Sequence, residues 1–280
     1  MRPVAGTPVR RNQRNEDGCL KILRIALTGV AVLVLALALL VWFMPARWAV
    51  AALGARLHGV RLEQVDGLVW RGRAGRVSSA DGTELGRVRW TLSRRALLGD
   101  VRLRLALQKP GMTFSGKLHR LSATEVDWSD VRLQADAALL DGSAWLRGNH
   151  LHGRLNVHIV DASLQGVWPM RLDAVAQWQD AAVDEGGRGV ALGNFQLHAQ
   201  GDGGVIRLDL GDGGHGPLQA SGKASLSPLG WRYRITLKPR TNDPALRQWL
   251  AGFGRLSSDG TLQLHGSGGL ARFTSRMEQR

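Results

Sequence analysis

Residues Val101–Leu107 read VRLRLAL, and this short run decides the fold class. Its four apolar residues alternate with Arg102, Arg104 and Ala106. Successive side chains of a strand point to opposite faces, so this period predicts a strand with one buried and one solvated face. Strands of a parallel sheet are apolar on both faces, so the alternation favours an antiparallel sheet.

The same alternation recurs along most of the chain. Turn signals such as ADG, LDG, GDGG and SSDG separate the runs. The runs are RVRWTL (87–92), HGRLNVHIV (152–160), NFQLHAQ (194–200), VIRLDL (205–210), GWRYRITLKP (230–239) and TLQLHG (261–266). We therefore predict a mainly β protein, built as a curved antiparallel meander over a single core.

Two segments after the N-terminal region have a helical pattern, PARWAVAALGARL (45–57) and NDPALRQWLAGFG (242–254). In the second segment Asn242 or Asp243 is placed to cap a helix, and Pro244 suits its first turn. Gly252 or Gly254 is placed to end it. We predict one or two short helices beside the sheet.

The run IALTGVAVLVLALALLVWFM (25–44) contains no charged residue. As a helix, twenty residues span about 30 Å, the thickness of a bilayer's hydrocarbon core. A cleaved signal peptide is the alternative, because AVAALGA (49–55) offers small residues to a peptidase. The length of the run and the long polar tail before it favour an uncleaved transmembrane anchor.

Charge around the anchor predicts its orientation. Three basic residues follow it closely (Arg47, Arg56, Arg61), whereas six precede it (Arg2, Arg10, Arg11, Arg14, Lys21, Arg24). This bias predicts a cytoplasmic N-terminus and a single-pass protein with its bulk on the other side. The predicted organisation is a disordered basic tail (1–24), the anchor (25–44), a juxtamembrane helix and linker (45–61), a β-rich domain (62–270) and a C-terminal tail (271–280).

The net charge of +14 over 280 residues invites a nucleic-acid interpretation. However, the arginines are scattered among acidic residues and no recognition motif accompanies them, so we predict no nucleic-acid partner. The single cysteine, Cys19, forms no internal disulfide. No nucleophile elbow, HExxH, P-loop or CxxC motif is present, so the sequence nominates no catalytic residue and no cofactor, and we do not predict an enzyme.

His150 and His152 are two positions apart on a predicted strand and therefore share a face. No acidic or cysteine residue lies beside them at a typical ligand spacing, so we predict no metal site. The segment VDGLVWRGRAGRV (65–77) is interpreted as a strand that begins after a turn at Gly67, with a bend or bulge at Gly72 or Gly75 and its arginines facing water. It is not a phosphate loop, because no helical pattern follows it.

The order of these segments resembles protein N of the bacterial type II secretion system. The resemblance covers most of residues 45–270 and rests on VDGLVWRGRAGRV, on LGRVRWTLSRRALLGDVRLRL (85–105) and on the C-terminal runs. Ser93, Arg94 and Arg95 depart from the proline that the family often has there. The matching motif residues are Gly67, Trp70, Gly72 and Ala74, which belong to a hairpin in that family, and then Gly86, Trp90, Leu97, Leu98 and Gly99.

The resemblance implies an accessory component of the type II secretion system, anchored in the inner membrane with a periplasmic domain. Its implied partners are the outer-membrane secretin and the inner-membrane platform proteins, and the family carries no catalytic residues. The β pattern is also distantly similar to AsmA-type proteins, which implies a carrier of lipid in an apolar groove as the alternative. Both resemblances imply an incompletely closed sheet, either an incomplete barrel or a groove.

Arginines at alternating positions on the N-terminal strands suggest a binding role. We hypothesise that Arg87, Arg89 and Arg102 contact an acidic partner surface or anionic lipid headgroups. A merely solvated face is the alternative interpretation. The edges of an open sheet also accept a partner's strand.

Overall fold

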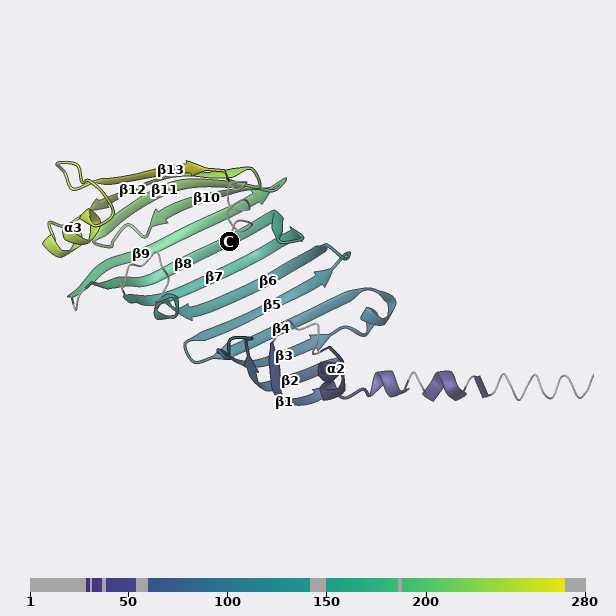
Figure 1. Cartoon of the computed structure of the whole chain (residues 1–280). Coiled ribbons are helices and arrows are strands. Elements are labelled where there is room, and N and C mark those ends of the chain that lie inside the picture. Colours follow the sequence, from purple (N-terminus) through teal and green to yellow (C-terminus); the bar gives the residue numbers. More distant parts are fainter. Residues whose placement is uncertain are drawn as a thin grey trace, which may run out of the picture.

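The computed structural model describes residues 29–30, 32–36, 39–53, 60–141, 150–185 and 188–269. Thirteen strands form one sheet in which each strand pairs antiparallel with the next one in the chain (Figure 1). The strands are β1 (Arg61–Leu68), β2 (Arg71–Ser78), β3 (Glu84–Leu92), β4 (Val101–Lys109), β5 (Met112–Arg120), β6 (Glu125–Asp136), β7 (His150–Gln165), β8 (Trp168–Glu185), β9 (Arg188–Asp202), β10 (Val205–Asp212), β11 (Leu218–Ser227), β12 (Gly230–Pro239) and β13 (Leu262–Gly268).

The prediction of a mainly β, antiparallel meander is confirmed, and the sheet is open, with β1 and β13 at its two edges. The helical elements are few and short: α2 (Ala46–Leu53), α3 (Pro244–Ala251) and the 3-10 helices η2 (Arg94–Leu98) and η3 (Ala137–Leu140). Because every connection joins neighbouring strands, each alternating run of the sequence contributes one strand to a continuous surface.

The strand register lines up the apolar residues across the whole sheet. One row runs from β1 to β13 through directly opposed residues, and we call the face that carries this row the apolar face. The row consists of Val65, Ala74, Val88, Leu107, Phe114, Leu133, Val157, Ala176, Leu197, Leu210, Gly222, Ile235 and Leu264. The neighbouring positions project from the opposite side, which we call the polar face.

The prediction of a single core is wrong, because the described residues form two separate clusters. One cluster lies where α3 meets the apolar face and includes Leu192, Leu246 and Leu250. The other is small and lies between β2 and β3, around Ala74 and Val88. The reason is geometric: a helix of eight residues is about 12 Å long, whereas thirteen strands span roughly 58 Å. One such helix covers only part of the face.

Helix α3 forms as the sequence predicts. Asp243 is its N-cap, with the carboxylate accepting a hydrogen bond from the Ala245 amide at 2.9 Å, and proline occupies the first turn. Leu246 and Leu250 are one turn apart and both are fully buried against the apolar face. Helix α2 lies within the predicted juxtamembrane helix.

The segment 65–77 differs from its prediction. It is a hairpin rather than one strand: the turn is at Val69 and Trp70, and Gly67 lies within β1 opposite Gly72. The register shift between Ala74 and Val77 confirms a bulge beside Gly75, and the arginines are exposed as predicted. The alternation continues through the turn, so the sequence pattern does not indicate where the turn lies.

Among the described residues, no helix is both long enough and apolar enough to cross a membrane. Part of the predicted anchor, residues 25–28, 31 and 37–38, lies outside the described residues, and so do both predicted tails and Cys19. The described residues of the anchor at 29–30, 32–36 and 39–42 are helical.

Candidate partner-binding surfaces

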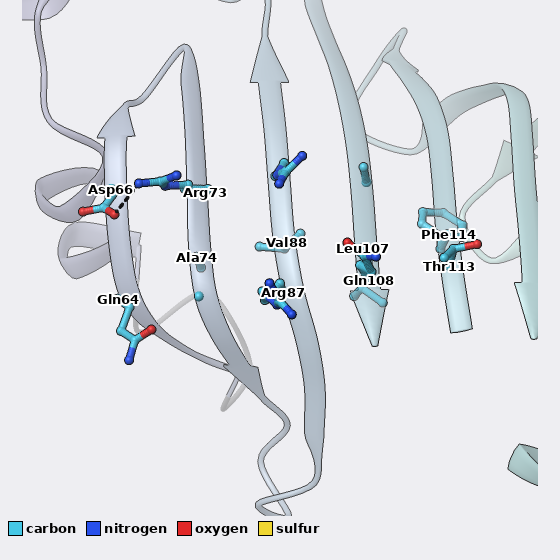
Figure 2. A pocket seen from close by; sticks show the side chains of 13 residues that line it. Gln64, Asp66, Arg73, Ala74, Arg87, Val88, Leu107, Gln108, Thr113 and Phe114 are labelled. Carbon is cyan, nitrogen blue, oxygen red and sulfur yellow. Dashed lines mark hydrogen bonds and ion pairs between the residues drawn. The ribbon is translucent and has the colours of Figure 1, made fainter. Parts of the chain in front are cut away.

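The polar face of β2, β3 and β4 carries a group of exposed arginines, which we call the arginine surface: Arg71, Arg73, Arg87, Arg89 and Arg104. They share one face because they occupy alternate positions on antiparallel strands in register. Three of them, Arg73, Arg87 and Arg89, line a hollow of about 440 Å³ together with residues that include Gln64, Asp66 and Gln108. Figure 2 shows Arg73 and Arg87 on neighbouring strands, with Asp66 bonded to Arg73.

Most of the charge on this surface is unneutralised. Arg73 pairs with Asp66 at 3.2 Å, but both side chains are mostly exposed, so the pair contributes only about 0–1 kcal/mol. The other four arginines form no ion pair with any residue that the structure describes. Arg73 also lies directly opposite Arg89, a like-charge arrangement, and Arg104 lies directly opposite Lys117, which is itself paired with Asp130 at 3.0 Å. The surface therefore attracts negative charge from outside the chain.

The structure brings together two of the three arginines in the hypothesis. Arg87 and Arg89 both line the hollow, whereas Arg102 lies six residues from Gln108, the residue opposite Arg87, or about 20 Å along β4. Arg102 also bonds to Asp100, Nε to Oδ1 at 3.0 Å, and this bond holds the pKa of Asp100 below its ordinary value. Its charge is therefore already engaged.

The motif residues build the first two hairpins of the sheet. The indole Nε1 of Trp90 donates to the carbonyl of Val69 at 3.0 Å, and its ring lies over Gly72, where a methyl group would overlap the ring. Trp70 is 7 % exposed and donates to the carbonyls of Val41 and Trp42 at 3.1 and 3.2 Å. The two tryptophans therefore tie the β1–β2 turn to β3 and to the preceding helical segment.

Two motif glycines are required by the backbone. Gly67 and Gly86 adopt φ angles of 89° and 102°, and at both positions a Cβ would collide with a carbonyl oxygen of the next strand. Ala74 is buried in the small cluster between β2 and β3 at 1 % exposure. These residues shape the sheet, and none of the three is part of the arginine surface.

The remaining motif residues form an exposed apolar tip. Leu97 and Leu98 end η2 and are 60 % and 88 % exposed, and Gly99 closes the turn with φ 89°. The guanidinium of Arg94 lies 3.7 Å from the centre of the Trp42 ring, which joins η2 to the end of the predicted anchor. We call Leu97 and Leu98 the leucine tip.

His150 makes a contact that its spacing in the sequence does not indicate. His150 Nδ1 lies 3.0 Å from Asp141 Oδ2, and the Leu151 amide and His150 hold the pKa of Asp141 below its ordinary value. Nine residues separate the pair, too far for a spacing rule to detect. Within the described ranges, no group of three His, Cys, Asp or Glu side chains is arranged to hold a metal ion.

The apolar face of β4 to β6 is uncovered by any described helix or strand. Leu105, Leu107, Phe114 and Leu133 are half-buried there, whereas Leu192, Leu246 and Leu250 are buried where α3 packs on the sheet. Exposed apolar surface of this kind is typical of an interaction site.

Comparison with known proteins gives one match. The family model for type II secretion system protein N matches residues 58–265, which include all of β1 to β12. No curated protein and no solved structure matches the chain significantly.

Proposed function

Because the family model covers most of the chain, this protein belongs to the type II secretion system protein N family, and we propose that it is a membrane-anchored accessory component of that system. In this proposal residues 25–44 cross the bacterial inner membrane once, the N-terminus is cytoplasmic, and the sheet lies in the periplasm. The sheet binds platform or secretin components while folded proteins are exported.

Two observations support the membrane position. The run 25–44 has no charge and more basic residues before it than after it. Around the end of that run, Trp42, Phe43 and Trp48 are 45–61 % exposed, and the leucine tip is joined to them through Arg94. Tryptophans and arginines beside apolar side chains are typical of the membrane interface.

The arginine surface carries the proposed partner contact, and the single observation behind it is the set of unneutralised charges at Arg87 and Arg89. An acidic surface on a platform protein or on the secretin would neutralise the like-charge contacts between strands. Such pairing favours association and fixes its orientation.

Charge reversal tests this contact. The double variant Arg87→Glu/Arg89→Glu is expressed in a bacterial strain from which the gene for this protein has been deleted. Its co-purification with platform and secretin components is measured together with export of a secreted hydrolase. We expect co-purification to fall about tenfold or more, because close interfacial charge pairs contribute about 1.5 kcal/mol or more. The matched control is Arg154→Glu/Arg171→Glu, which reverses two exposed polar-face arginines outside the hollow.

The variant Arg102→Glu tests whether the loss of co-purification is specific to the arginine surface or follows from the reversal of any arginine. Since Arg102 is engaged by Asp100, we expect its reversal to affect co-purification less than the double variant does. Unchanged co-purification in the double variant, with the domain folded, would contradict the proposed contact.

A second candidate function is supported by the uncovered apolar face of β4 to β6. An AsmA-like carrier would hold acyl chains against Leu105, Leu107 and Phe114. The full chain is purified in a detergent and its organic extract is analysed by mass spectrometry. Stoichiometric phospholipid in the extract, lost in the Leu105→Glu variant, would favour the lipid-carrier function. An extract without lipid would contradict that function and leave the role in secretion as the supported one.

A further inference from the structure

The last strand of the sheet, β13, has a free edge with no described strand beside it. We infer that β13 is a docking site for an extended partner segment whose residues alternate between apolar and acidic. This site is separate from the arginine surface, so its failure would leave the proposed contact there untouched.

The backbone of β13 is suited to strand addition. Its seven residues pair with β12 without a register shift, and none has a positive φ. Leu262–Gly268 also contains no lysine, arginine, acidic residue or proline, the residues by which natural edges usually block further pairing. Alternate amides and carbonyls therefore point outward in a regular, uninterrupted row.

The opposite edge lacks these properties. β1 carries Arg61, Glu63 and Asp66, and Gln64 has a φ of 54° that breaks its regularity. Its last residue, Leu68, is already bridged to Pro45 on the outer side. Only one of the two edges is therefore prepared for an added strand.

On the apolar face, aromatic rings reach the free edge of β13. Trp231 and Tyr233 on β12 are stacked, with ring centres 5.7 Å apart and planes at 12°. Gly266 and Gly268 lie under them: a Cβ on Gly266 would be 2.9 Å from Tyr233 Cε1, and one on Gly268 would be 2.9 Å from Trp231 Cζ2. Because the glycines have no side chains, the rings extend over β13, where apolar side chains of an added strand would contact them.

On the polar face the same edge is basic. Arg232 lies opposite Ser267, and Arg234 lies opposite His265. Both arginines are exposed and have no ion-pair partner in the part of the chain that is described. They line a hollow of about 820 Å³ whose one acidic residue, Asp209, is paired with Lys223 at 3.3 Å.

The positive charges of Arg232 and Arg234 favour a partner strand with acidic residues. An added strand would lie about 10 Å from β12, a gap that arginine and glutamate side chains together can bridge over Ser267. A second copy of β13 would offer Gln263, His265 and Ser267 at these positions, none of which is acidic. Charge complementarity therefore favours a different protein with acidic residues over a second copy of this chain.

A peptide tests the site directly. The heptapeptide acetyl-Glu-Leu-Glu-Val-Glu-Leu-Glu-amide is titrated into the detergent-solubilised full chain, and amide hydrogen exchange is followed along the sequence. We expect exchange to slow about tenfold at alternate positions of residues 262–268, because outward amides gain hydrogen bonds. Amides of β1 should be unchanged.

Two control peptides isolate the mechanism. One carries N-methyl groups on alternate residues, which remove the backbone donors while keeping every side chain. The other replaces glutamate by lysine. Both should fail to protect β13; equal protection by either would overturn the inference.

Protein variants complete the test. Arg232→Glu/Arg234→Glu should weaken binding of the peptide about tenfold, since two opposite-charge contacts are replaced by like-charge ones. Arg154→Glu/Arg171→Glu, which reverses two exposed arginines away from both β13 and the arginine surface, is the matched control and should bind the peptide normally. The inference is wrong if β13 stays unprotected at saturating peptide, or if β13 is already protected by self-association of the chain.

Discussion

The apolar face is sealed where α3 packs on it and only half-buried over β4 to β6, although both regions belong to one continuous sheet. Leu192 on β9 and Leu250 on α3 are 2 % and 0 % exposed where the helix packs on the sheet. On β4, Leu105 and Leu107 are half-buried. Alternation therefore tells which side chains share a face, whereas the cover over that face depends on what the chain places above it.

The largest effect is expected beneath α3. Leu250→Ala should lower the free energy of unfolding by about 2–5 kcal/mol, because it leaves a cavity in a closed cluster. Denaturant unfolding of the detergent-solubilised chain measures it. A loss no greater than that of Leu105→Ala would show that α3 does not seal the face.

A smaller effect is expected at the Asp212–Arg240 pair, which lies beside the same sealed region. The Asp212 carboxylate accepts from the Ala220 amide at 2.7 Å and from Arg240 Nη2 at 2.8 Å. Asp212→Asn should cost about 1–3 kcal/mol, since a half-buried guanidinium loses its charged partner. The measurement is again denaturant unfolding, at neutral pH.

The pH dependence of stability gives this pair a second test. Burial raises the pKa of Asp212, but the bonds from Arg240 and from the Ala220 and Gly214 amides outweigh it, so the pKa lies below its ordinary value. A lowered folded-state pKa contributes stability above the unfolded pKa, and that stability is lost as pH falls below about 4. Asp212→Asn should unfold with a flatter dependence on pH in that range; an unchanged slope would argue against the pair.

On the bare region the matched substitution should be mild. Leu105→Ala should cost only about 1 kcal/mol, because the side chain is half-exposed and leaves no closed cavity. Binding of an apolar fluorescent dye should weaken in the same variant. A loss as large as that of Leu250→Ala would show that something covers β4 in solution.

The smallest effect is expected at Asp209, where the ion pair with Lys223 is exposed. The two side chains are 58 % and 86 % accessible, so Asp209→Asn should change the free energy of unfolding by less than about 1 kcal/mol. It is the matched control for Asp212→Asn in the same unfolding measurement. An equal loss in both variants would mean that burial does not distinguish the two pairs.

The sequence predicted the features that depend on residues close together in the chain. The alternation around Leu103 and Leu105 identified their face, and the Asp243–Pro244 pair identified the start of α3. Contacts over long separations were missed: Asp212 and Arg240 are 28 residues apart, and nothing in either neighbourhood indicates the other. The alternation alone did not reveal the hairpin turn at Trp70, because it continues through the turn, whereas the family resemblance implied a hairpin there.

The candidate binding surfaces show the same difference between local features and features that depend on distant residues. The shared exposed face of Arg87 and Arg89 could be predicted because they are two positions apart on one strand. Arg102 has the same pattern, but its neighbour Asp100 neutralises it, which depends on side-chain conformation rather than on spacing. The free edge at β13 follows from the order of the strands in the sheet. The alternation within any one strand does not indicate that order.

The sequential strand order also bears on how this chain is made. Since every strand pairs with the one synthesised just before it, each new strand finds its partner already in place as the polypeptide emerges. Such a sheet grows by local steps, with little of the entropic cost of distant pairing. Folding can therefore keep pace with synthesis of the chain, and β13 is the last described strand to be added.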